Sequence, residues 1–141
     1  MRIFFYLYFY ITFCFFSYLS AGELKIYVKN IKNNIGSIHY ALYDDPKYFP
    51  KQEGRILGGN KNINEVLIEG ISIKNLREAF YAVAIYHDEN SNKKFDTFLS
   101  LPTERYGFSN NAPIFLGPPK FNDASFFVSR NNIIEIEIEL R

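Results

Sequence analysis

The sequence predicts an all-β fold, an antiparallel β-sandwich of about seven strands. Apolar side chains alternate with polar ones in several short segments, which is typical of strands with one buried face. Asn, Asp, Gly and Pro residues separate these segments, and no segment repeats its apolar residues at the helical period. A chain of 141 residues, 48% of them hydrophobic, has room for one domain and enough apolar surface for its core.

The clearest predicted strand lies at the C-terminal end. Residues 133–140 read IIEIEIEL, so Ile134, Ile136 and Ile138 are expected to face the core and three glutamates to face solvent. Residues 80–86 read FYAVAIY, a nearly continuous apolar run. Such a run predicts a central strand that is buried on both faces.

The first two alternating segments, residues 23–30 and 35–43, are predicted to pair as a hairpin around a turn at 32–34. Further strands are expected at 64–69, 71–74 and 123–129, and irregular structure at 47–62 and 113–119. The predicted core consists of Leu24, Ile26, Val28, Ile38, Leu67, Val83, Ile85, Phe127, Ile134, Ile136 and Ile138.

Residues 1–21 have the order of a secretory signal peptide. Arg2 precedes an apolar run, and small residues follow it. We expect cleavage after Ala21 or Gly22, which leaves 22–141 as a single mature domain. The domain would be exported to the periplasm or cell envelope, or secreted, with no stable membrane insertion. The alternative is a retained anchor, because the apolar run is close to the shortest length that spans a bilayer.

The composition excludes several classes of protein. Without Arg2 the mature domain has equal numbers of basic and acidic residues, so its net charge predicts no attraction to nucleic acid or to an anionic membrane surface. The single cysteine, Cys14, lies in the predicted signal peptide, so the mature domain would have neither a disulfide nor thiol chemistry. No nucleophile-elbow, Walker, zinc-protease or dinucleotide-binding motif is present.

Residues 88–96, DENSNKKFD, are the candidate metal site. Oxygen-bearing side chains at alternate positions match the start of the calcium-loop pattern D-x-[DN]-x-[DN]-G, and calcium takes about six to eight oxygen ligands. Lys93 stands where this pattern has glycine, and Leu99 where it has glutamate. The alternative is a turn whose Asx side chains bond their own backbone. The predicted calcium ligands are the side chains of Asp88, Asn90, Asn92 and Asp96 and the carbonyl of Lys94.

Two functions from different classes remain open. The first is a non-enzymatic module that binds or scaffolds an envelope protein or glycan through its loops. Its candidate surface also includes His87, Glu104, Tyr106, Ser109 and Asn110. The second is a hydrolase or lyase acting on envelope glycans or peptides, with His87 and either Asp88 or Glu104 as acid and base. Convergence of these groups in a cleft would favour the enzyme. Alternatively, His87 is a structural residue bonded to neighbouring backbone.

Three motifs follow one another in the second half of the chain: YAVAIYHDENSNKKFDT, PTERYGFSNNA and GPPKFNDASF. Together they resemble the DUF2141 family of secreted bacterial proteins of unknown function. The resemblance implies an exported β-sandwich with no established activity. The family usually has glycine where Ser91, Lys93 and Arg105 stand here, which concerns the loop more than the fold. The central strand also resembles sandwiches of the transthyretin-like and calcium-loop adhesin type, so we expect an immunoglobulin-like or transthyretin-like sandwich.

Overall fold

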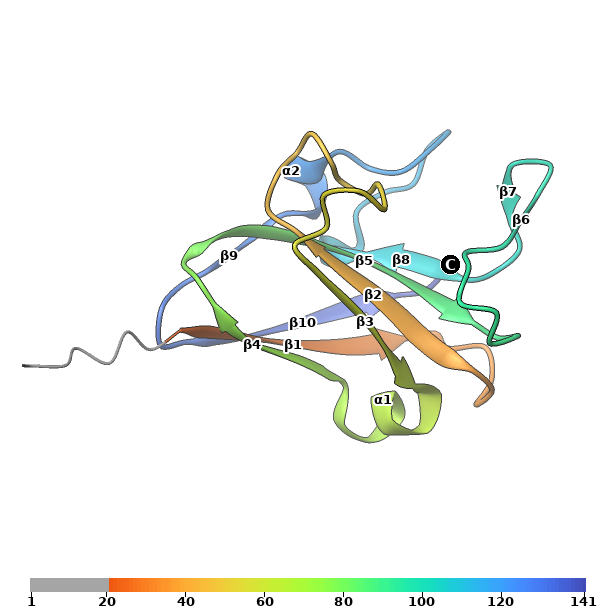
Figure 1. The fold of residues 1–141 in the computed structure, drawn as a ribbon, viewed down its shortest axis with the longest axis horizontal. Helices are drawn as coiled ribbons and strands as arrows, with labels where there is room; N and C mark the ends of the chain where they lie inside the picture. Colours follow the sequence, from red (N-terminus) through yellow and green to blue (C-terminus); the bar gives the residue numbers. More distant parts are fainter. Residues whose placement is uncertain (1–20) are drawn as a thin grey trace, which may run out of the picture.

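Two β-sheets pack against each other in the computed structural model, which describes residues 21–141 (Figure 1). The first sheet has the strand order β10–β1–β4, and it consists of β1 (Gly22–Lys29), β4 (Ile71–Leu76) and β10 (Ile133–Glu139). The predicted signal peptide lies outside the described residues, except for Ala21. No helix within 21–141 is long and apolar enough to cross a membrane.

The second sheet has the order β3–β2–β5–β8, and β9 pairs with the start of β5. Its strands are β2 (Ser37–Tyr43), β3 (Leu57–Asn62), β5 (Ala79–Asp88), β8 (Tyr106–Phe108) and β9 (Phe126–Val128). A small separate hairpin is formed by β6 (Thr97–Phe98) and β7 (Leu101–Pro102). The helical segments are α1 (Ile63–Glu69), the single 3-10 turn η1 (Ser109–Asn111) and α2 (Phe121–Ala124). The all-β, sandwich-like prediction is therefore confirmed.

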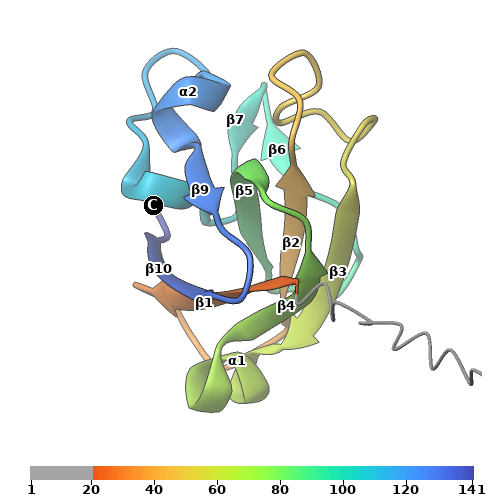
Figure 2. The ribbon, with the colours of Figure 1, turned by 90° about the vertical axis from the view of Figure 1, so that its left-hand side faces the viewer.

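The main core lies between the two sheets, whose strands cross steeply in Figure 2. Alternating aliphatic side chains of β1, β4 and β10 meet those of β2 and β5 across this interface. Most of the predicted core residues are buried or pack against this cluster. Leu67 and Phe127 were predicted wrongly, because both are exposed.

The predicted hairpin of 23–30 with 35–43 is wrong, because β1 and β2 belong to different sheets. β1 pairs with β4 in the antiparallel sense and with β10 in parallel, with Ile26 opposite Ile136. Alternation shows that a segment has one buried face, but it does not identify the partner strand. The central strand was predicted correctly: β5 lies between β2 and β8, and Tyr81 to Val83 are buried.

The segment predicted as a strand at 64–69 is the helix α1. The Asn62 side chain accepts the N–H of Asn64, which caps the helix, and Gly70 at φ 69° ends it. Ile63 and Val66 are its two buried residues, one helical turn apart. A second correction concerns 47–62, where irregular structure was expected but β3 forms over its last six residues.

At its C-terminal end the chain forms less strand than predicted. Of the residues 123–129, only Phe126–Val128 are strand, and α2 precedes them. A second, smaller apolar cluster covers the opposite face of the second sheet. It packs aromatic residues from the connecting segments onto that face and consists of Tyr43, Phe49, Ala82, Phe108, Ala112, Phe121 and Ala124. This outer face carries the candidate site.

Candidate functional site

The register of the second sheet places its smallest side chains side by side. Gly58 on β3 is opposite Ala41 on β2, Ala41 is opposite Ala84 on β5, and Ala84 is opposite Phe108 on β8. All four face outward, because side chains alternate between the two faces of a strand. Three small neighbours in one row leave a depression across the middle of the outer face.

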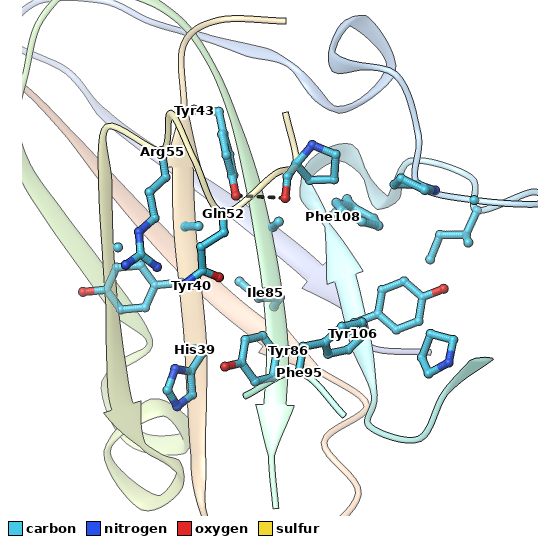
Figure 3. Close-up of a pocket in the computed structure, with 18 of the residues that line it drawn as sticks. His39, Tyr40, Tyr43, Gln52, Arg55, Ile85, Tyr86, Phe95, Tyr106 and Phe108 are labelled. Atoms are coloured by element: carbon cyan, nitrogen blue, oxygen red, sulfur yellow. Dashed lines mark hydrogen bonds between the residues drawn. The ribbon is translucent and has the colours of Figure 1, made fainter. Parts of the chain in front are cut away.

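The next row on the same face carries polar and aromatic side chains. Asn60, His39, Tyr86 and Tyr106 are neighbours across β3, β2, β5 and β8. The His39 and Tyr86 rings stack with centroids 4.8 Å apart and an interplanar angle of 16°. Phe95, from the loop after β5, lies 5.3 Å from the Tyr86 ring and 5.4 Å from the Tyr106 ring. These four rings form one wall beside the row of small residues (Figure 3).

Together these rows form the floor and wall of an open cleft of about 1080 Å³. Three other parts of the chain surround it: the segment 50–55, the β6–β7 hairpin and the loop 114–118. The side of the cleft opposite the ring wall is formed by Tyr43, whose hydroxyl donates to the Pro50 carbonyl at 3.1 Å (Figure 3). The volume is that of a pocket for a small organic ligand.

Gly58 lets Arg55 lie along the edge of this cleft. A Cβ atom at Gly58 would come within 3.2 Å of the Arg55 Cδ and within 3.3 Å of its Nε. The missing side chain therefore provides the space that the arginine stem occupies. Arg55 makes no ion pair with another residue of the described range 21–141, so its guanidinium is available to a ligand.

The acid–base side chains that line the cleft, tyrosines apart, are all basic. They are His39, Arg55 and Lys93, and no Asp or Glu is among the described lining residues. Burial lowers the pKa of His39 below its ordinary value, more than the nearby Asp88 raises it, so the ring is neutral at pH 7. Burial also raises the pKa of Tyr86 to about 12, so its phenol keeps its proton. At neutral pH the cleft thus has two fixed positive charges.

The predicted calcium loop, 88–96, lies beside this cleft and is closed by its own hydrogen bonds. The buried Asp88 carboxylate accepts the backbone N–H of Asn92 at 3.1 Å and that of Lys93 at 2.9 Å. Its Oδ2 also lies 3.1 Å from Nε2 of His39, without the alignment of a hydrogen bond. Asp88 therefore organises the turn and backs the cleft wall.

The remaining predicted ligands bond one another. The side-chain amides of Asn90 and Asn92 donate to Asp96 at 2.6 and 2.8 Å, which lowers the pKa of that carboxyl. The Asn92 side-chain oxygen accepts the N–H of Lys94 at 2.8 Å. Within 21–141, no three or more His, Cys, Asp or Glu side chains are grouped so as to hold a metal. The observed geometry is that of an Asx-bonded turn, and calcium binding stays a prediction.

The three groups predicted for acid–base chemistry do not converge. His87 and Asp88 are consecutive on β5, so their side chains point to opposite faces of the sheet. His87 is buried under the inner face with Nε2 2.7 Å from the Ile35 carbonyl. The buried Glu104 accepts the N–H of Asp96 at 3.1 Å, and burial raises its pKa. None of the three lines the cleft.

Of the other predicted surface residues, Tyr106 lines the cleft and two do not. Ser109 is fully buried, where its hydroxyl accepts the Val83 N–H and donates to the Ala124 carbonyl. Asn110 is exposed and donates to the Ser125 carbonyl at 2.7 Å. Both hold η1 against its neighbours. Sequence reasoning missed His39, Arg55 and the small residues of the floor, because their grouping depends on strand register.

One comparison with known proteins gives a match. The model of a family described as an uncharacterized protein conserved in bacteria (DUF2141) matches residues 26–135. This range includes the strands that form the floor of the cleft and the loops that surround it. No curated protein and no solved structure matches the chain.

Proposed function

The chain belongs to the DUF2141 family, and we propose that it is an exported binding module whose ligand site is the cleft on the outer face of the second sheet. The ligand is a small amphiphile with a flat apolar body and an anionic group. The observation that carries this proposal is the lining itself: a floor of small residues, a wall of rings, and basic side chains with no opposing carboxylate. Export is proposed on the pattern of residues 1–21.

The apolar body of the ligand is expected to lie over Ala41 and Ala84. The absence of larger side chains there leaves room for a ring or chain next to the sheet. Tyr86, Phe95 and Tyr106 then contact it from one side, where aromatic rings favour offset or edge-on packing. Removing this surface from water provides the main part of the affinity.

The anionic group is expected to meet Arg55 and Lys93. A guanidinium offers two parallel N–H donors to a carboxylate, sulfonate or phosphate. No carboxylate among the described lining residues competes for these donors. His39 is neutral at pH 7 and contributes by stacking on Tyr86, and the protonated phenol of Tyr86 is a further donor.

The experiment uses two fluorescent probes that share one ring system, anilinonaphthalene sulfonate, which is anionic, and phenylnaphthylamine, which is neutral. We expect the protein to bind the anionic probe more tightly. Arg55→Gln should lower the affinity for the anionic probe by about tenfold and leave the affinity for the neutral probe unchanged, because only the sulfonate pairs with the guanidinium.

The floor is tested with Ala84→Phe, which places a ring in the cleft where Ala84 is only half-buried. Both probes should then be excluded. Ser72→Phe is the matched control, because Ser72 is exposed on β4 of the other sheet. Thermal unfolding of each variant verifies that it is folded. Unchanged probe binding in a folded Ala84→Phe variant would contradict the proposed site.

A further inference from the structure

Two loops that flank the cleft carry the most exposed apolar side chains near it. Leu99 is 82% exposed, and its neighbours Phe98 and Leu101 in the β6–β7 hairpin are 69% and 70% exposed. In the loop 113–119, Phe115 is 83% exposed and Leu116 is 97% exposed. Figures 1 and 2 show the β6–β7 hairpin at the end of the molecule opposite α1. Five large apolar groups are thus presented to solvent around one opening.

Both loops also place a leucine in the left-handed backbone region. Leu99 has φ 48° and Leu116 has φ 54°. The other residues with positive φ in the described range are asparagine, glycine, serine and one lysine. Asn and Gly adopt this conformation at lower cost, and neither exposes apolar surface. Strained backbone combined with an exposed apolar side chain, found twice beside the same cleft, indicates a functional contact.

We infer that these two loops dock the protein on an anionic phospholipid surface. Leu101 and Leu116 line the same cleft as Arg55 and Lys93. The five exposed apolar side chains of the two loops, here called the apolar tips, thus lie beside basic groups. This arrangement matches the interface of a bilayer, where acyl chains lie beneath anionic headgroups. A fluid bilayer can accept two separate loops at once, and it closes around each. The whole mature chain is neutral, so the attraction is local to this opening and the apolar tips supply most of the binding.

This docking surface goes beyond the proposed ligand site and does not depend on it. The exposed apolar side chains of the two loops are not part of the floor of the cleft, so a protein that binds no small ligand could still dock. Conversely, a cleft that binds the soluble probes need not contact lipid. The geometry would, however, open the cleft at the level of the headgroups, where an anionic amphiphile is available.

The test uses residues 22–141, which hold both sheets and both apolar clusters and lack the apolar leader. The chain has no tryptophan, so Leu116→Trp and Ile68→Trp each introduce one reporter. Vesicles of equal parts phosphatidylglycerol and phosphatidylcholine should shift the emission of the Leu116→Trp protein to shorter wavelength. Ile68→Trp is the control, because Ile68 is 86% exposed on α1 at the other end of the molecule and should stay in water.

Affinity is measured by co-sedimentation with the same vesicles. Leu99→Ser combined with Leu116→Ser should weaken binding by about tenfold or more, because two buried leucines are lost. Leu67→Ser combined with Ile68→Ser removes the same number of exposed aliphatic groups from α1 and should leave binding unchanged. Ala84→Phe should also leave it unchanged, which separates docking from the ligand site.

Three results would overturn the inference. The first is that the 22–141 protein stays in the supernatant at every lipid concentration. The exposed loops would then be assigned to contact with a protein partner and not with lipid. The second is an equal loss in the two double variants. The third is equal affinity for vesicles of phosphatidylcholine alone, because docking on an anionic surface requires added acidic lipid to tighten binding and added salt to weaken it.

Discussion

The loop 88–96 and the cleft beside it use polar side chains in opposite ways. In the loop, Asp88 and Asp96 accept hydrogen bonds from the turn's own backbone and amides. In the cleft, Arg55 makes no ion pair within the described residues, and the floor is formed by side chains too small to fill it. A dense group of polar residues can therefore use its hydrogen bonds entirely to stabilise its own turn. A ligand site instead needs open space beside polar groups whose hydrogen-bonding capacity is still free.

Among the variants that test this difference between the loop and the cleft, the largest expected effect is a loss of stability on removing Asp88. Asp88→Ala removes a buried acceptor from two backbone N–H groups, so we expect the free energy of unfolding to fall by about 2–3 kcal/mol. Asp96→Ala, whose carboxylate bonds side-chain amides near solvent, should cost clearly less. Urea unfolding of both variants measures the difference. Equal losses would mean that Asp88 does not organise the turn.

Adding calcium tests whether the loop 88–96 binds a metal ion. With a dissociation constant of about a millimolar, typical of extracellular modules, about 5 mM calcium would raise the free energy of unfolding by about 1 kcal/mol. EDTA should reverse the gain, and Asp96→Ala should abolish it, because Asp96 is the one of the two predicted carboxylate ligands that is not fully buried. Identical melting curves with calcium and with EDTA would leave the loop as an Asx turn alone.

A smaller effect is expected from His39 as pH falls. Burial lowers its pKa in the folded state, so protons bind the unfolded chain more readily. The stability that this residue contributes is therefore full above the ordinary histidine pKa of about 6.5 and declines as pH falls below it. His39→Gln should lose this dependence. Urea unfolding at pH 7.5 and pH 5 compares the two proteins, and parallel declines would show that His39 does not titrate in this range.

Local patterns predicted the strands but not their partners. The alternation of residues 133–140 and the apolar run at 80–86 correspond to β10 and β5, because burial of one or both faces leaves a period in the sequence. The helix α1 was missed because seven residues contain only one helical spacing of buried side chains, Ile63 and Val66. The three motifs of the second half predicted the family correctly.

The candidate site was harder to predict than the strands. Gly58, Ala41 and Ala84 are far apart in sequence, and only the register of three strands makes them one floor. Arg55 lies in a segment that was expected to be irregular and that carries no motif. Tyr106 was selected as a surface residue and does line the cleft, but His39 and Tyr86, which lie in the same row of side chains, were not part of that selection.

The most direct test of the ligand site is a titration of the 22–141 protein with anilinonaphthalene sulfonate, followed through the backbone amide resonances. We expect the largest shifts at Ala41, Gly58 and Ala84, which form the floor of the cleft, and smaller ones in the first sheet. The same titration of Ala84→Phe should leave these resonances in place. Shifts centred on α1 or on the first sheet, with the floor unmoved, would contradict the assignment of this cleft as the binding site.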